Sequence, residues 1–134
     1  MTENNRIEEA KNRKASGRLN CAQSVACTYC DIAGTDEETM AAAAAAFGTG
    51  MGNLEGTCGA LVGAGIILGM KTADRVKARA HMKNIMKRFK ERNGSTTCRE
   101  LKGVGTGRPL RACNDCVADA AEFLEMELNK IEGV

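Results

Sequence analysis

Apolar residues recur at intervals of three and four along most of this chain, and these intervals are typical of amphipathic α-helices. The clearest stripe lies near the C-terminus and consists of Val117, Ala121, Leu124, Leu128 and Ile131. No segment shows a convincing alternation of apolar and polar residues, as a half-buried strand would. The pattern therefore predicts an all-α fold, a bundle of about five helices joined by short loops.

Capping residues and glycines divide the chain into separate helices. Helices are predicted at 4–16, 20–33, 35–47, 58–70 and 72–93, followed by a short helical turn from 98 and a last helix that carries the C-terminal stripe. Asn20 with Gln23 and Thr35 with Glu38 have the spacing of capping boxes, in which the two side chains satisfy each other's free backbone N–H groups. The alanine run 41–46 favours a helix after the second box.

The helix predicted at 58–70 is unusual because it carries Gly59, Gly63, Gly65 and Gly69. Each glycine costs a helix about 1 kcal/mol relative to alanine, so four of them need a reason. Close packing of a neighbouring helix is the favoured explanation, and a cofactor pressed against Gly59 and Gly63 is the alternative. The preceding glycine-rich turn, 48–52, is expected to form a wall of any site at Cys58.

Length and composition limit the classes of function. A chain of 134 residues with 43% hydrophobic content suits one helical domain, 1–134, in which 1–16 is an N-terminal extension or short helix. The formal charge is only +2, and aromatic residues make up 3% with no Trp. Proteins that bind single-stranded nucleic acid use aromatic side chains for stacking. We therefore expect no nucleic-acid partner.

No segment has the composition of an export signal or a membrane span. Residues 1–16 are charged throughout, and the longest apolar run, 60–70, is too short to cross a bilayer and is interrupted by glycines. The sequence therefore favours a cytoplasmic protein with no membrane partner, and it is compatible with a homodimer. Because the cytosol keeps thiols reduced, the seven cysteines are expected to be ligands or reactive thiols and not structural disulfides.

Charge is unevenly distributed between two predicted helices. Segment 71–92 carries nine Lys or Arg against two acids, whereas 115–132 carries six acids against one Lys. The two helices could pair inside the bundle, or the basic one could dock an acidic redox partner. His81, the only histidine, lies in the basic segment and is expected to be a surface or packing residue, because no ligand motif surrounds it.

Three cysteines follow directly after an Asn or Thr that would cap a helix: Cys21, Cys58 and Cys98. Such a thiol lies in the first turn, at the positive end of the helix dipole, where a thiolate is stabilised. Glu100 stands where the capping-box partner of Thr97 belongs, whereas the residue before Cys58 lacks such a partner. These positions point to redox or metal chemistry.

The chain also contains two Cys-x-x-Cys pairs, Cys27 with Cys30 and Cys113 with Cys116. Paired with each other they would supply the four thiolates of a zinc site. This signal is weak, because the first pair falls inside a predicted helix and the two pairs are far apart in sequence. We expect Cys27, Cys30 and Cys116 to pack in the apolar core, away from the other cysteines.

Four stretches around cysteines form an ordered set. They are Asn20-Cys-Ala-Gln-Ser-Val25, Gly56-Thr-Cys-Gly-Ala-Leu-Val-Gly-Ala64, Gly94-Ser-Thr-Thr-Cys-Arg-Glu-Leu101, and Cys113 four residues before Val117. Over roughly 17–128 the chain resembles the redox-active family named for its C…CGAxxG…C…C pattern. The resemblance implies a small helical protein whose signature cysteines are here Cys21, Cys58, Cys98 and Cys113. A domain similar to this family occurs in split-Soret type cytochromes, where it is associated with a non-haem iron–sulfur centre.

Three functions remain open for these four cysteines. The first is an electron carrier or redox sensor in which Cys21, Cys58, Cys98 and Cys113 bind a 2Fe-2S cluster and exchange electrons with a redox partner protein. The second is a thiol–disulfide oxidoreductase that attacks through Cys58 and uses another cysteine to resolve. The third is a structural zinc site. All three hypotheses require the four sulfurs to meet in the fold.

Overall fold

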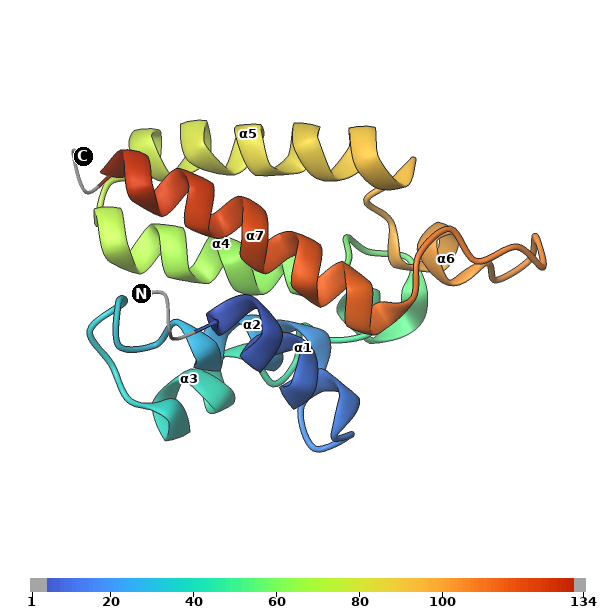
Figure 1. Cartoon of the computed structure of the whole chain (residues 1–134), viewed down its shortest axis with the longest axis horizontal. Helices are drawn as coiled ribbons and strands as arrows, with labels where there is room; N and C mark the ends of the chain where they lie inside the picture. Colours follow the sequence, from blue (N-terminus) through green and yellow to red (C-terminus); the bar gives the residue numbers. More distant parts are fainter. Residues whose placement is uncertain (1–4, 132–134) are drawn as a thin grey trace.

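The computed structural model describes residues 5–131, most of which are helical (Figure 1). The elements are α1 (Arg6–Ala15), α2 (Cys21–Thr28), α3 (Glu37–Ala44), the π-helical turn η1 (Gly50–Leu54), α4 (Gly59–Thr72), α5 (Arg75–Asn93), α6 (Cys98–Lys102) and α7 (Cys113–Ile131). The all-α prediction is confirmed, although the described residues form seven α-helices and one π-helical turn instead of about five helices. Their β-structure is one isolated bridge, between Thr57 and Thr97.

Several predicted helix boundaries are wrong, among them the end of the third helix, which is Ala44 instead of 47, and the start of α5, which is capped by Asp74 and begins at Arg75 instead of 72. The second helix ends at Thr28, and residues 29–34 form turns instead of the last turn of a helix. The third helix is capped by Asp36, whose side chain accepts a hydrogen bond of 2.7 Å from the Thr39 N–H, so Thr35 does not form the predicted capping box. The first helix lies within the predicted range 4–16, of which residue 4 is outside the described residues.

The core forms where α4 packs against α2, α5 and α7. The face of α4 that meets α2 carries Gly59 and Gly63, and a Cβ on Gly63 would lie 2.5 Å from the backbone oxygen of Ala22. A Cβ on Gly59 would lie 2.7 Å from the backbone oxygen of Phe47. Close approach of neighbouring backbone therefore explains these two glycines. Around Gly69 the same construction meets no atom within 4 Å.

The basic helix α5 and the acidic helix α7 pair with each other. Glu127 of α7 is fully buried and accepts hydrogen bonds from Arg88 at 2.6 Å and Asn84 at 3.1 Å, while His81 Nδ1 lies 2.7 Å from its carboxylate. Burial alone would raise the pKa of Glu127, but its hydrogen-bonding partners, with His81 and Arg88 the largest, lower it to about 2. His81 is thus a packing partner of Glu127, as expected from its sequence context.

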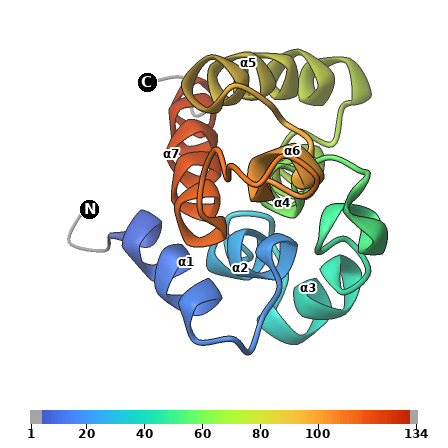
Figure 2. The same ribbon diagram turned by 90° about the vertical axis from the view of Figure 1, so that its right-hand side faces the viewer.

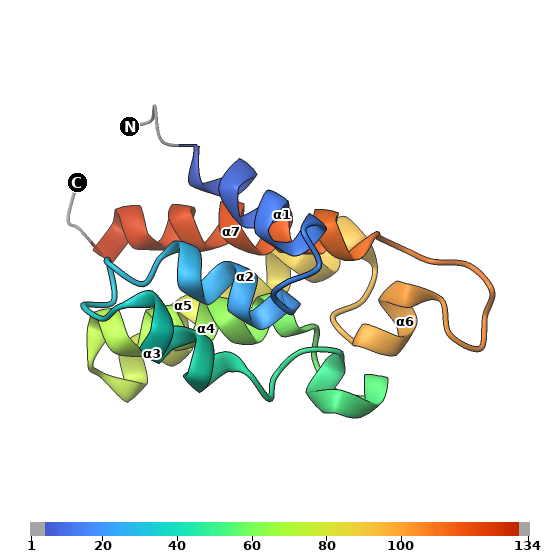
Figure 3. The same cartoon turned by 90° about the horizontal axis from the view of Figure 1, so that it is seen from below.

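Several helices begin at the same end of the bundle. In Figure 1 helices α2, α4 and α7 start at the right-hand end, where α6 lies, and Figure 2 looks onto that end. The loop between α6 and α7 projects from it (Figure 3). Within residues 5–131 we find no helix with the length and apolar character needed to cross a membrane. The first residues of the helices that carry cysteines therefore lie together at this end of the bundle.

A five-cysteine candidate redox site

Five cysteines line one small cavity at the end of the bundle where these helices begin. The cavity has a volume of about 40 Å³, and its cysteines are Cys21, Cys58, Cys98, Cys113 and Cys116. Its other walls are formed by Lys14, Asn20, Thr49, Gly59, Leu101, Lys102 and Arg111. The fold therefore brings the four predicted cysteines together across the whole sequence, and Gly59 lies beside them. Gly63 is one turn further along α4 and packs against α2.

Cys116 corrects one prediction, because it lines the cavity instead of lying apart. It follows Cys113 by three residues on α7, and residues at that spacing lie on the same helix face. Cys27 and Cys30 do pack away from the cavity in the apolar core, where burial raises the pKa of both thiols. The two Cys-x-x-Cys pairs therefore do not meet as a zinc site would require.

Cys21 and Cys58 occupy different positions at their helix starts, because Cys21 follows the N-cap whereas Cys58 is the N-cap. Asn20 caps α2 through the predicted box, with hydrogen bonds of 2.7 Å and 2.9 Å shared with Gln23. Cys58 is itself the N-cap of α4, so the prediction that Thr57 caps this helix is wrong. Its sulfur makes no conventional capping hydrogen bond, yet the N–H groups of Ala60 and Leu61 lie close enough to stabilise a thiolate.

The start of α6 also differs from its prediction. Thr97 occupies the N-cap position, but its side chain makes no capping hydrogen bond, so the predicted box with Glu100 is wrong. Ser95 makes these side-chain hydrogen bonds in place of Thr97. Its hydroxyl accepts a hydrogen bond of 3.0 Å from the Thr97 N–H and donates one to the Glu100 carboxylate. Cys98 is the first residue of this short helix and is 6% exposed.

Backbone hydrogen bonds hold the starts of α4 and α6 side by side. The Cys58 N–H donates to the Thr96 carbonyl at 2.8 Å, and the Cys98 N–H donates to the Gly56 carbonyl at 3.0 Å. Both bonds flank the isolated bridge. Two cysteines separated by forty positions are therefore fixed as neighbours by main-chain contacts.

The glycine-rich turn forms a wall of the cavity, as predicted, through Thr49. Thr49, Met51 and Leu54 all have positive φ, at 52°, 67° and 71°, a conformation that side chains other than glycine seldom adopt. Gly50 lies against α6, because a Cβ there would be 2.5 Å from Cys98 Cβ. The turn therefore packs closely against Cys98.

The first thiol pair joins α2 to α7. A hydrogen bond from the Cys21 thiol lowers the pKa of Cys113 to about 5, helped by the charges of Lys102 and Lys14, and the same bond together with burial raises the pKa of Cys21. Cys113 is the only one of the five site cysteines that is not buried. The pair therefore consists of a half-exposed thiolate, Cys113, and a buried thiol, Cys21.

The second thiol pair joins α4 to α7. The Cys116 thiol hydrogen-bonds to Cys58 and lowers the pKa of Cys58, whose thiolate is further stabilised by the backbone N–H groups at the start of α4. The same bond and burial raise the pKa of Cys116. Cys98 interacts with one cysteine of each pair: burial raises its pKa, and the charges of Cys58 and Cys113 raise it further.

Positive charge surrounds these sulfurs. Lys14 and Lys102 line the cavity, and the negative Cys113 raises the pKa of Lys102 despite the opposing effect of burial. Arg111 also lines it and is held by the buried carboxylate of Asp119 through hydrogen bonds of 2.9 Å and 3.0 Å. The cavity is thus electrostatically suited to a negatively charged group.

Sequence reasoning missed Cys116 and the two lysines. The spacing of three between Cys113 and Cys116 on one predicted helix was a usable signal for the first. Lys14 and Lys102 carry no local signal, because they reach the cavity only through the way α1 and α6 pack against the other helices.

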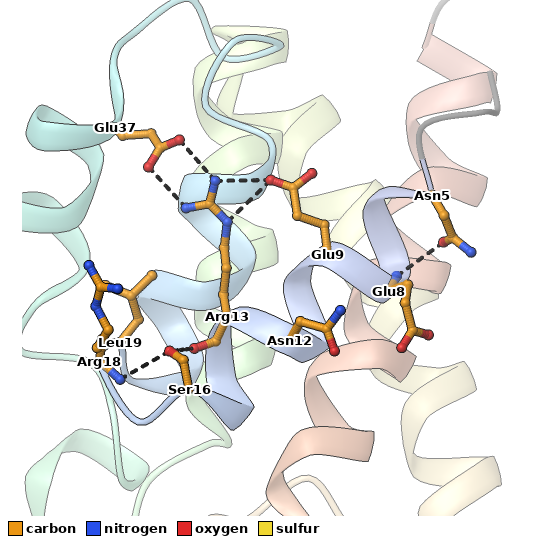
Figure 4. Close-up of a pocket in the computed structure, with 9 residues that line it drawn as sticks. All are labelled: Asn5, Glu8, Glu9, Asn12, Arg13, Ser16, Arg18, Leu19 and Glu37. Atoms are coloured by element: carbon orange, nitrogen blue, oxygen red, sulfur yellow. Dashed lines mark hydrogen bonds and ion pairs between the residues drawn. The ribbon is translucent and has the colours of Figure 1, made fainter.

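The described residues contain no cluster of three or more His, Cys, Asp or Glu side chains arranged to hold a single metal ion. A wider hollow of about 900 Å³ lies elsewhere, along α1 and the start of α3 (Figure 4). Its lining side chains are polar or charged except for Leu19, and Arg13 is paired with Glu9 and Glu37 at 2.9 Å each. No cysteine lines this hollow.

Comparison with known proteins gives one match. Residues 19–126 match the profile of the family described as "Putative redox-active protein (C_GCAxxG_C_C)". Searches among curated proteins and among solved structures find no match. The matched region contains all five cysteines of the cavity.

Proposed function

Because the chain belongs to this C_GCAxxG_C_C redox-active family, we propose that its cysteine cavity binds a 2Fe-2S cluster through Cys21, Cys58, Cys98 and Cys113. The chain would then be an electron carrier or redox sensor that works with a redox partner protein. The observation that carries the proposal is the convergence of these thiols from four helix starts on one buried, positively charged cavity.

The size of the cavity and the donor atoms fit such a group. At about 40 Å³ the cavity accommodates a few atoms, whereas pockets for organic ligands of drug size occupy about 300–1,000 Å³. The side chains that could act as ligands in its walls are all cysteines, without carboxylate or imidazole. Thiolates in sets of four are the ligands that two-iron clusters take from proteins.

The arrangement of the sulfurs supports a cluster more than a single zinc ion. The close contacts are pairwise, Cys21 with Cys113 and Cys58 with Cys116, and Cys98 lies near both pairs. Each iron of a two-iron cluster takes two cysteine ligands, whereas zinc needs four donors around one point. Cys21 and Cys113 would hold one iron, and Cys58 and Cys98, which main-chain hydrogen bonds hold side by side, would hold the other.

The chain also supplies what a negative group needs. The N–H groups of Ala60 and Leu61 stabilise a negative Cys58, the starts of α2 and α7 at Cys21 and Cys113 are the positive ends of two further helix dipoles, and Lys102 with Lys14 adds positive charge. Without a bound cation, several thiolates this close would repel one another. When bound, a 2Fe-2S cluster would supply one-electron transfer, and the buried sulfurs would keep water away from it.

Burial favours electron transfer over exchange with bulky substrates at Cys58. Its side chain is 4% exposed, so a protein disulfide has little access to its sulfur. Electrons need no such direct contact. Exposed cations on the outer face of α5, among them Lys83, Lys87 and Lys90, remain available for an acidic redox partner.

The proposal predicts a reducible chromophore. Anaerobically purified protein should be coloured, and its visible absorption should bleach on reduction with dithionite and return on reoxidation. The reduced protein should give an electron paramagnetic resonance signal of one unpaired electron. Cys27→Ser and Cys30→Ser should keep these signals, because both residues lie away from the cavity. Colourless protein that cannot be reconstituted with iron and sulfide would contradict the proposal.

A second candidate function is thiol–disulfide exchange, and one observation favours it. Cys113 is the half-exposed thiolate of the site and is hydrogen-bonded to the buried thiol of Cys21. Attacking thiols in such enzymes have a low pKa and are accessible, and a neighbouring thiol resolves the mixed disulfide. The nucleophile in this alternative is therefore Cys113, with Cys21 resolving, and not Cys58.

The pH dependence of alkylation tests the Cys113 thiolate. Because its pKa lies near 5 instead of at the usual value near 8.5, iodoacetamide should modify Cys113 rapidly at about pH 7, and the rate should fall only as the pH drops through about 5. Lys102→Gln should raise this midpoint, because it removes a stabilising charge. Site-resolved mass spectrometry measures both rates. A midpoint above about pH 8 would exclude a stabilised thiolate at Cys113.

A further inference from the structure

A surface with exposed apolar side chains and arginines lies at the cavity end of the bundle. It is formed by η1, α6 and the α6–α7 loop at 103–112, and we call it the α6 surface; Figure 2 looks onto this end. Its exposed apolar side chains are Met51, Val104 and Leu110, which are 54%, 36% and 49% exposed. Apolar side chains combined with arginine are typical of protein–protein interfaces.

The charge of the α6 surface is positive. Residues 94–112 carry one acid, Glu100, against four cations, which gives a net charge of +3. With Glu55, which directly follows η1, cations still outnumber acids. The four cations are Arg99, Lys102, Arg108 and Arg111. Arg99 and Arg108 are exposed and form no ion pair with a carboxylate of the described residues, so their charges are available to a partner.

Main-chain hydrogen bonds tie both ends of the α6–α7 loop to α6. At the first end, the Val104 N–H donates to the Arg99 carbonyl at 3.0 Å. At the other end, the N–H groups of Leu110 and Arg111 both donate to the Leu101 carbonyl, at 2.9 Å and 3.3 Å. The loop is thus held in one arrangement before any partner binds, which reduces the entropy lost on binding.

The α6 surface adjoins the cysteine cavity. Lys102 and Arg111 belong to both, because they also line the cavity. Cys113, the one site cysteine that is not buried, directly follows the loop. The exposed α5 cations Lys83 and Lys87, by contrast, do not line the cavity. Of these two basic surfaces, the α6 surface is therefore the one in direct contact with the cavity wall.

We propose that the α6 surface is the docking site of an acidic electron-transfer protein. Its cations complement the partner's carboxylates and steer the approach, and its exposed apolar side chains supply packing contacts. A second copy of this chain does not fit, because a symmetric interface brings the same cations face to face. Nucleic acid fits poorly, because residues 50–54 and 94–112 contain no aromatic side chain for stacking. That the partner transfers electrons rests on the proposed function, whereas its acidic character rests on the surface itself.

Calorimetric titration of the full chain with an acidic plant-type ferredoxin tests the inference. The ferredoxin should bind at low ionic strength, and the affinity should fall at least about tenfold in about 0.3 M salt, which screens the charges. The double variant Arg99→Glu/Arg108→Glu should bind at least about tenfold more weakly than Lys83→Glu/Lys87→Glu on α5. The two variants have the same net charge, so the difference between them reports where the ferredoxin docks. Circular dichroism checks that both are folded.

Carbodiimide cross-linking, which joins a lysine to a carboxylate in contact with it, locates the ferredoxin directly. Mass spectrometry should find the ferredoxin linked to Lys102 in preference to Lys83 and Lys87. The inference would be overturned by cross-links at α5 alone, by equal losses of affinity in the two variants, or by the lack of salt-sensitive binding. Tighter binding to a short single-stranded DNA than to the ferredoxin would also overturn it. Failure of the proposed cluster would show separately, as an absence of iron in anaerobic protein that still binds the ferredoxin.

Discussion

Replacing Cys58 with alanine should remove nearly all bound iron and acid-labile sulfide from anaerobically purified protein. Cys58 is the N-cap of α4 and interacts with both Cys98 and Cys116 in the cavity, so its loss leaves the proposed cluster without one of its four ligands. No other side chain of α4 with a metal-binding atom lines the cavity. Iron and sulfide assays per chain give the result.

Two matched controls accompany this variant. Cys27→Ala and Cys30→Ala remove buried thiols of the same size that lie in the apolar core away from the cavity, and they should keep wild-type iron content. Far-ultraviolet circular dichroism of all three variants checks that the helices remain. A folded Cys58→Ala variant with undiminished iron would show that the cluster, if present, lies elsewhere.

Replacing Gly63 with leucine should be the most destabilising single substitution on the glycine face of α4. Even its Cβ would lie 2.5 Å from the Ala22 carbonyl oxygen, and this oxygen belongs to the backbone of α2 and cannot rotate away. The two helices would have to separate at the core. We expect a loss of about 3 kcal/mol or more in the free energy of unfolding, and a fall in Tm of about 10 °C.

Gly69→Ala is the control on the same helix. The added Cβ meets no atom within 4 Å, so the better helix propensity of alanine should raise stability by about 1 kcal/mol. Thermal unfolding followed by circular dichroism measures both variants. Equal Tm values for wild type and Gly63→Leu would show that α2 and α4 do not pack as closely as the structure indicates.

The helical fold could be predicted because its signals are local. The stripe from Val117 to Ile131 and the capping box at Asn20 depend on residues a few positions apart, and both are present. The N-caps at Asp36 and Cys58 were missed because a neighbouring Thr competes for each position, and tertiary contacts decide which residue enters the helix. Helix boundaries are correspondingly the least predictable feature.

The site could be predicted in part. Positions after Asn and Thr identified Cys21, Cys58 and Cys98 as thiols at helix starts, and the family pattern added Cys113. Their convergence depends on how whole helices pack, and the main-chain hydrogen bonds that join Cys58 to Thr96 and Cys98 to Gly56 leave no trace in the local sequence. The same holds for Lys102, whose contact with Cys113 joins two separate helices.

The iron and sulfide content of wild-type protein purified without oxygen tests the central claim most directly. The account predicts about two iron atoms and two acid-labile sulfides per chain, with zinc well below stoichiometry. One zinc per chain, or a colourless protein that binds neither iron nor sulfide after reconstitution, would contradict it. The first result would make the five-cysteine cavity a structural metal site, and the second would leave it as a set of reactive thiols.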